Sequence, residues 1–434
     1  DAQDEAHEAQ PGAPVPESSP PPRKGHGRNG ADAYTNARDI FVEHPDLKPG
    51  DPCPVRGCRG KVYESLSPAV FVRIVGSHPL EAARYRLQRL RCNLCGEVFT
   101  ADTPDAVGRR KYDERAAAII AMQKYGFGVP FYRMEVFLGN LGLPLPASTQ
   151  WEVVEELAGT LRPVFHELVD LAARGRLIHN DDTSMRILSA GLPPKGQEDE
   201  DRRAIFTSAL ASVVGDRTVV LFFTGRKHAG EAMAALLRRR PTDQPPPVQM
   251  CDALSRNLPA PFRTVLANCL VHARRQFVDV MTSFPEPCRH VIEVLAEVYR
   301  NEEETAGMSP AGRLRHHRIH SRPLMEDLHR WLKEQLGQKL VEPNSGLGKA
   351  IAYMLRHWKP LTLFLRLPGV PLDNNLVERA IKFVILHRKN ALFYRTEHGA
   401  EVGDIFMSVF HTCRLAGVNI YDYLIHLQTH ADQV

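Results

Sequence analysis

The chain has 434 residues, of which 43% are hydrophobic and 24% charged, an ordinary composition for a protein with packed domains. No apolar stretch reaches the roughly 18 residues that a membrane-spanning helix needs, and the first twenty residues lack the pattern of a secretory signal. The formal net charge of +4, from 55 basic and 51 acidic residues, predicts no partner by itself. We therefore expect no membrane span and no export.

Basic residues are nevertheless concentrated in a few segments, at 84–91, 238–240, 313–322 and 379–395. Such stripes are usually solvated helix faces. Several of them in one chain favour a polyanionic partner such as nucleic acid.

The N-terminal part contains a tail and a cysteine-rich segment. Residues 1–30 are rich in proline, serine and glycine and nearly free of apolar side chains, so we expect a disordered tail. Residues 31–105 carry two cysteine pairs separated by β-type sequence such as 69–75. The paired cysteines are Cys53, Cys58, Cys92 and Cys95. This pattern predicts a zinc-ribbon-like module in which four thiolates hold a structural Zn²⁺; the alternative is that they are free thiols.

Residues 106–175 read as a helical DNA-binding or linker region. Good helix formers precede Gly126, and Pro144 and Pro146 interrupt the pattern. A second helix is expected to start with Ser148 as its N-cap and to close at Gly175.

Residues 176–287 alternate strand and helix patterns, which is typical of the first part of a mixed α/β core. A strand is expected at 177–181, followed by a polar loop at 191–203. Two strands joined by Gly215-Asp216 read as a hairpin. Further expected elements are a helix at 228–240, a short strand at 247–254 and a helix at 268–284.

The C-terminal third is predicted to be helical. Residues 288–370 lack any strand pattern and are interpreted as a helical insertion, with helix starts at Ser309 and Ser321. Residues 371–434 are expected to form the helical C-terminal part of the core.

Three acids stand where elements begin or end. Asp181 ends the strand at 177–181, Asp252 follows the next short strand, and Glu378 lies just inside a helix that Asp373 or Asn374 can cap. Acids at strand ends and helix starts can meet at one edge of a sheet, and carboxylates are the ligands that Mg²⁺ prefers. The alternative without a metal is that each acid is simply a turn or cap residue.

Several segments occur in an order that resembles the insertion sequence 66 family of bacterial DDE transposases. They are "LIHNDDTSMRIL", "CDALSRN", "CLVHARRQF", "PLDNNLVERAIKFVILHRKNALF" and the tail "TEHGAEVGDIFMSVFHTCRLAGVNIYDYL". The resemblance covers roughly residues 23–430, and the DNN-x-x-E-R block is its most specific element. It implies an RNase H-like catalytic core in which Asp181, Asp252 and Glu378 hold divalent Mg²⁺ or Mn²⁺.

The same resemblance separates Asp181 from its neighbour. Asp182 stands where the family often has Glu, and Ser184 where it often has Pro. Neighbouring side chains on a strand face opposite ways, so only one of the two Asp residues faces the metals, and the match selects Asp181.

Further residues are expected to support the acids. On the helix after Asp252, His272 and Arg275 share a polar face with Gln276 and Asp279, which is either simply solvated or contacts phosphates. Asn374 is expected to orient Glu378 or to cap its helix. Basic side chains that suit DNA phosphates are Arg379, Lys382, Arg388 and Lys389.

The resemblance implies a DNA transposase that cleaves phosphodiesters at the ends of an insertion sequence and joins them to target DNA. Two alternatives are a metal nuclease on the same fold without strand transfer and a catalytically silent DNA-binding derivative. We expect a homo-oligomer on DNA in the bacterial cytoplasm, associated with the nucleoid, with accessory proteins of the element as possible partners.

Overall fold

The structure is a computed structural model that describes residues 31–33, 37–65, 69–74, 76–108, 110–189 and 204–431. The predicted tail at 1–30 and the predicted polar loop at 191–203 lie outside the described residues. The chain divides into two compact units, Asp1–Ser77 and His78–Val434. Each unit is described by itself.

The first unit has little regular structure among its described residues. It contains a short 3-10 helix, η1 (Ala31–Ala33), and an isolated antiparallel bridge between Pro52 and Lys61. The expected strand at 69–75 is wrong, because the described residues 69–74 form no strand. Val70, Phe71 and Ile74 are 67%, 88% and 79% exposed, so no core covers them within this unit.

The second unit begins with a small hairpin. Strands β1 (Arg89–Arg91) and β2 (Val98–Thr100) pair antiparallel. A 3-10 turn, η2 (Asp105–Val107), follows.

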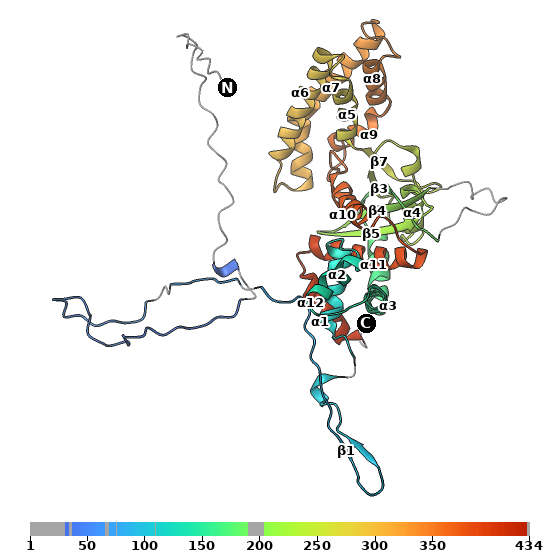
Figure 1. Ribbon diagram of the computed structural model, residues 1–434. Helices are drawn as coiled ribbons and strands as arrows, with labels where there is room; N and C mark the ends of the chain where they lie inside the picture. Colours follow the sequence, from blue (N-terminus) through green and yellow to red (C-terminus); the bar gives the residue numbers. More distant parts are fainter. Residues whose placement is uncertain are drawn as a thin grey trace, which may run out of the picture. The chain divides into compact units, whose positions relative to one another are not determined.

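A five-stranded mixed sheet forms the centre of the second unit (Figure 1). Its strands are β3 (Leu177–Met185), β4 (Ile205–Val214), β5 (Arg217–Gly225), β6 (Val248–Cys251) and β7 (Val265–Asn268). The order across the sheet is β5-β4-β3-β6-β7. β3, β4 and β5 are antiparallel neighbours, whereas β3, β6 and β7 run parallel.

The strand predictions hold in part. The two-residue turn Gly215-Asp216 joins β4 to β5 as expected, with Gly215 at a φ of 63° that favours glycine. The predicted end of the first strand at Asp181 is wrong, because β3 stays paired with β4 as far as Met185. β7 was not predicted, because it is a short apolar stretch directly before a helix.

Helices cover both faces of the sheet, and alternate strand residues face the two layers. Ala209, Ala211, Val220 and Phe222 face one core, shared with α10 (Asn375–Ala391) and α11 (Glu397–Leu415). Leu210 and Leu221 face the other, shared with the end of α3 (Ala147–Ala173) and with α4 (Ala229–Leu237). The period of two along each strand therefore builds a three-layer arrangement.

Polar side chains of α11 also bind the edge strand β5. Phe222 N donates to Ser408 Oγ at 2.9 Å, and Thr224 Oγ1 donates to Asp404 Oδ1 at 2.7 Å. The backbone donors of the edge strand are thus covered by a helix instead of being open to another chain.

The N-terminal helices pack on this framework. They are α1 (Glu114–Ala121), the π-helical turn η3 (Met122–Gly126), α2 (Phe131–Asn140) and α3. Ser148 is not the N-cap of α3 as predicted: the cap is Pro146, and Ser148 lies in the first turn.

Residues between the last strand and α10 contain helices and no strand, and every residue there is described. α5 (Leu270–Val280) leads from the sheet into α6 (Pro285–Glu303), α7 (Pro310–Gly337), α8 (Gly346–Arg356), α9 (Trp358–Leu361) and the 3-10 turn η5 (Leu363–Leu365). α6, α7 and α8 stand together beyond the β7 edge of the sheet (Figure 1).

One of the two expected helix starts in this segment is wrong. Ser309 caps α7 and accepts a hydrogen bond from Gly312 N at 3.2 Å, as predicted. Ser321 lies in the middle of the same helix, fully buried, where its hydroxyl contacts His317 and Asn301.

The chain closes with α12 (Ile420–Thr429) after α11. Across the described ranges, no helix is both long enough and apolar enough to cross a membrane.

Candidate active site

The register of two parallel strands places Asp181 beside Asp252. β3 pairs with β6 from Leu177–Val248 to His179–Met250. Two residues further on each strand are Asp181 and Asp252, so the same register sets them at matching positions where the β3–β6 ladder has just ended. The two strands therefore present an acid each at the point where they separate.

Glu378 reaches the same region from a helix. It lies in the first turn of α10, which packs against β3 and β4. The pKa of Asp181 is raised to about 7, chiefly because burial disfavours the carboxylate; the Asp182 N–H opposes the shift, and the negative charges of Asp252, Asp182 and Glu378 add to it. The structure thus brings the three predicted acids into one electrostatic environment.

Asp182 points the other way and is compensated. Its side chain is only 2% exposed, and its oxygens lie 3.0 Å from His228 Nδ1 and 3.3 Å from Arg256 Nη2. Ala229 N also donates to Asp182 Oδ2 at 3.3 Å. Of the two neighbouring acids, Asp182 therefore has cationic and amide partners, whereas Asp181 faces the other carboxylates.

A network of buried side-chain amides leads to Asp252. Gln249 Nε2 donates to Asn180 Oδ1 at 2.9 Å and to Asn257 O at 2.7 Å. Asn257 Nδ2 donates in turn to Asp252 Oδ1. Burial raises the pKa of Asp252, while His272 and Arg256 oppose that rise. The network fixes the direction of the Asp252 carboxylate.

Helix α4 closes over this network at a glycine. A Cβ on Gly230 would lie 2.5 Å from the carbonyl oxygens of Arg256 and Leu258, so only glycine allows α4 to approach the 3-10 turn η4 (Ser255–Asn257). That approach holds the turn that supplies Asn257 to Asp252.

The start of α10 is tied to β3 by Asn374. Its Oδ1 lies 2.9 Å from His179 Nδ1, and its Nδ2 donates to Asn180 O at 3.2 Å. The side chain of Asn374 therefore bonds to the sheet and makes no N-cap hydrogen bond. Asp373 Oδ1 accepts from Asn375 N at 3.1 Å instead.

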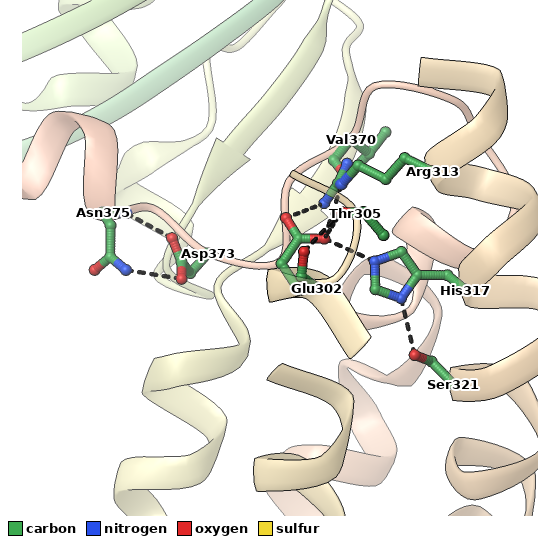
Figure 2. A network of polar contacts seen from close by, with 8 residues as sticks. All are labelled: Glu302, Thr305, Arg313, His317, Ser321, Val370, Asp373 and Asn375. Carbon is green, nitrogen blue, oxygen red and sulfur yellow. Dashed lines mark hydrogen bonds and ion pairs between the residues drawn. The ribbon is translucent and has the colours of Figure 1, made fainter. Parts of the chain in front are cut away.

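A second network holds the segment that leads into α10 (Figure 2). Glu302 of α6 binds Arg313 of α7 through both carboxylate oxygens at 2.8 Å, and Glu302 Oε2 lies 2.7 Å from His317 Nε2. Arg313 Nη1 then donates to Val370 O at 2.7 Å. The helical insertion thereby fixes the chain five residues before Asn375. Sequence reasoning missed this network, because its members are scattered and match no motif.

His272 and Cys269 complete the surroundings of Glu378. His272 Nδ1 of α5 lies 3.8 Å from Glu378 Oε1, with the two side chains 27% and 26% exposed. One ligand atom each from Cys269, His272 and Glu378 lie within 4.8 Å of one another. In the part of the chain that the structure describes, this is the one such cluster of three or more potential metal ligands.

Of the side chains predicted to contact phosphates, four are exposed to solvent and one is hydrogen-bonded to the sheet. Arg275, Arg379, Lys382 and Lys389 are exposed. Arg388 instead turns onto β3, where its Nη1 donates to Thr183 Oγ1 at 3.1 Å and to Ser184 Oγ at 2.8 Å. Arg388 therefore connects α10 to the strand that carries Asp181.

The two cysteine pairs belong to different units, and each forms a turn of its own. Cys53 N donates to Gly60 O at 2.8 Å, and Cys58 Sγ accepts from Gly60 N at 3.4 Å. In the β1–β2 hairpin, Cys92 N donates to Glu97 O at 2.8 Å. Backbone N–H groups of Cys95 and Leu94 lower the pKa of Cys92 to about 7, which favours the thiolate that metals bind.

The fold is that of an α/β protein in which Asp181 and Asp252 lie at matching positions of two parallel strands and Glu378 lies at the start of the helix α10. The family model described as "Transposase IS66 family" matches residues 109–402, about two thirds of the sequence. The chain belongs to the IS66 transposase family, which confirms the resemblance seen in its motifs.

Three relatives come from Sinorhizobium fredii (strain NBRC 101917 / NGR234), and all are described as uncharacterized proteins. y4jD is 30% identical over 322 residues, covering 71% of this chain and 60% of the relative. y4hP is 25% identical, covering 76% and 62%. y4qI is 25% identical, covering 74% and 60%. The chain thus spans about three fifths of the length of these relatives.

The two neighbouring acids should respond oppositely to loss of charge in metal-free protein. Asp181→Asn removes a carboxylate that other carboxylates repel, so the free energy of unfolding should stay the same or rise. Asp182→Asn removes the partner of Arg256 and His228 and should lower it by about 1–3 kcal/mol. Urea unfolding with a chelator present measures both. A larger loss for Asp181→Asn than for Asp182→Asn would reverse the roles given to the two acids.

Proposed function

We propose that the chain is the transposase of a bacterial insertion sequence, which cleaves DNA at the ends of the element and transfers the strands to target DNA. Membership of the IS66 family indicates a transposase, and DNA is the partner that a transposase acts on. The observation that supports the proposed chemistry is that Asp181 and Asp252 lie at matching positions of two parallel strands, while the charges of Asp252 and Glu378 act on Asp181.

The sheet topology supports an RNase H-like core as the frame of this site. A three-stranded antiparallel meander, β3 to β5, is extended on the β3 side by the parallel strands β6 and β7. Such a core places acids on its central strand and on the adjacent parallel strand, as Asp181 and Asp252 are placed here. Under this proposal, residues 288–370 are a helical insertion, and residues 371–434 return to the core with the third acid.

The residues of the site fit divalent cations. Three carboxylates supply hard oxygen ligands, and buried Glu378 Oε1 has no hydrogen-bond partner. Burial and neighbouring carboxylates both disfavour the ionised form of Asp181. A bound cation would stabilise that ionised form. Asp181, Asp252 and Glu378 would hold Mg²⁺ or Mn²⁺, which supply a lowered pKa for an attacking hydroxyl and charge stabilisation for a leaving oxygen.

The remaining side chains position these acids and the DNA. Asn257 directs Asp252, Asn374 ties α10 to β3, and the Arg313–Val370 contact fixes the approach to α10. The exposed cations Arg275, Arg379, Lys382 and Lys389 are proposed to bind phosphates, together with His272 beside Glu378. Arg388 is also proposed to bind DNA, from its position beside Thr183 and Ser184 of β3.

We propose that Cys53, Cys58, Cys92 and Cys95 hold a structural Zn²⁺ in an N-terminal zinc-ribbon-like module. Each pair forms a turn whose N–H groups point at sulfur, and these bonds lower the pKa of Cys58 and Cys92. We also propose a homo-oligomer on DNA, with accessory proteins of the element, acting in the bacterial cytoplasm at the nucleoid.

Asp252→Asn should abolish chemistry while leaving DNA binding intact. The amide keeps the size and an acceptor for Asn257 but removes the charge that holds cations. Cleavage and joining of pre-cut ends, both with Mg²⁺, should fall by several orders of magnitude. DNA binding rests on Lys and Arg contacts and should persist. Asp279→Asn, at an exposed position of α5, is the matched control.

Near-parent joining by Asp252→Asn would show that Asp252 is not a metal ligand. Cleavage without any joining by the parent chain would favour a metal nuclease. DNA binding without either reaction would favour a silent DNA-binding derivative.

Zinc analysis tests the N-terminal module. Chelator-free protein should carry zinc that depends on Cys95, because a ribbon site closes with four ligands. Cys95→Ser should lose about one zinc per chain, whereas Cys413→Ser, a change of a buried cysteine on α11, should lose none. Equal zinc contents in the two variants would contradict the module.

A further inference from the structure

Cys269, His272 and Glu378 meet on the side of Glu378 that faces α5. Cys269 is the N-cap residue of α5, and His272 follows three positions later on the same face of the helix. Their ligand atoms and a Glu378 oxygen lie within 4.8 Å of one another. One thiol, one imidazole and one carboxylate thus converge from the starts of two helices.

Two of the three ligand atoms are buried and have no hydrogen-bond partner. His272 Nδ1 and Glu378 Oε1 both lack one. The distance of 3.8 Å between them is too long for a hydrogen bond. It is close to the separation of two ligands around one tetrahedral zinc ion, about 3.4 Å for bonds of roughly 2.1 Å. Buried polar atoms without partners are costly, so an ion between them would satisfy both.

The Cys269 thiol lies close to the same two side chains, His272 and Glu378. Cys269 is 1% exposed, and its Sγ accepts a hydrogen bond from Asn374 N at 3.3 Å. That bond joins the start of α10 to the start of α5, so both helices aim their first-turn ligands at one point.

We propose that Cys269, His272 and Glu378 form a binding site for Zn²⁺ that competes with the catalytic cations for Glu378. The donor set decides the metal: sulfur and nitrogen suit Zn²⁺, whereas Mg²⁺ requires oxygen ligands. Glu378 therefore belongs to two alternative sets, one with Asp181 and Asp252 and one with Cys269 and His272. Zinc bound to the second set withholds Glu378 from the first and inhibits the reaction.

The inhibitory consequence rests on the proposed transposase chemistry, but zinc binding does not. Binding is therefore measured first, on the full chain stripped of metal, by titration with Zn²⁺ against a zinc-chelating dye. Cys269→Ser is the main variant, because serine is a good N-cap and keeps the helix start intact. Cys288→Ser, at another buried cysteine in α6, is the control. His272→Gln removes the second ligand.

The parent chain should bind one zinc more than Cys269→Ser and His272→Gln, or bind it at least about 10–100-fold more tightly. Cys288→Ser should match the parent. The cysteines of the proposed N-terminal module are unchanged in all four proteins, so their zinc cancels in the comparison. Equal zinc number and affinity in the parent and in both ligand variants would overturn the site.

Regulation is tested by the ratio of joining rates with and without Zn²⁺ at constant Mg²⁺. The ratio should be small for the parent and for Cys288→Ser and closer to one for Cys269→Ser. Equal ratios in parent and Cys269→Ser would overturn the competition for Glu378. A parent that binds the extra zinc but joins no DNA would leave the site standing and contradict the transposase chemistry instead.

Discussion

Repulsion among the carboxylates of Asp181, Asp252 and Glu378, beside the point where β3 and β6 stop pairing, is the constraint on which the surrounding structure depends. The parallel register brings Asp181 and Asp252 to matching positions just where the ladder ends, and α10 adds Glu378. Burial and mutual repulsion raise the pKa of Asp181 to about 7. Burying like charges together costs free energy, so the residues around these acids must hold them in place.

The surroundings meet that requirement in three ways. Asp182, next in the chain, forms an ion pair with Arg256 and contacts His228, so its carboxylate has partners of its own. The side chains of Asn180 and Gln249 bond to each other and to the carbonyl oxygen of Asn257, whose side-chain amide donates to Asp252. The start of α10 is fastened to the sheet by Asn374, while Arg313 of the helical insertion holds Val370 before it. The helical insertion therefore helps to fix the segment between Val370 and Asn375, which leads into the helix that carries Glu378.

The sequence predicted the parts of this site that depend on local pattern. Apolar stretches that lead to an acid drew attention to Asp181 and Asp252, and the family resemblance singled out these two acids together with Glu378. The alternation of strand residues also placed Asp181 and Asp182 on opposite faces. What it missed depends on contacts between distant segments. β7 is too short and too close to α5 to stand out, and Ser321 is a buried interior residue because His317 and Asn301 bind it. The segment 69–75 has strand composition, but its described residues find no partner strand.

A crystal structure of the chain with Mn²⁺, located by its anomalous scattering, would show whether the three acids share a metal ion. Manganese takes the oxygen ligands that magnesium takes. We expect an anomalous peak within about 2.1 Å of carboxylate oxygens, with Asp181, Asp252 and Glu378 as the protein ligands. A structure in which Mn²⁺ binds elsewhere, and these three carboxylates remain without a shared ion, would contradict this expectation.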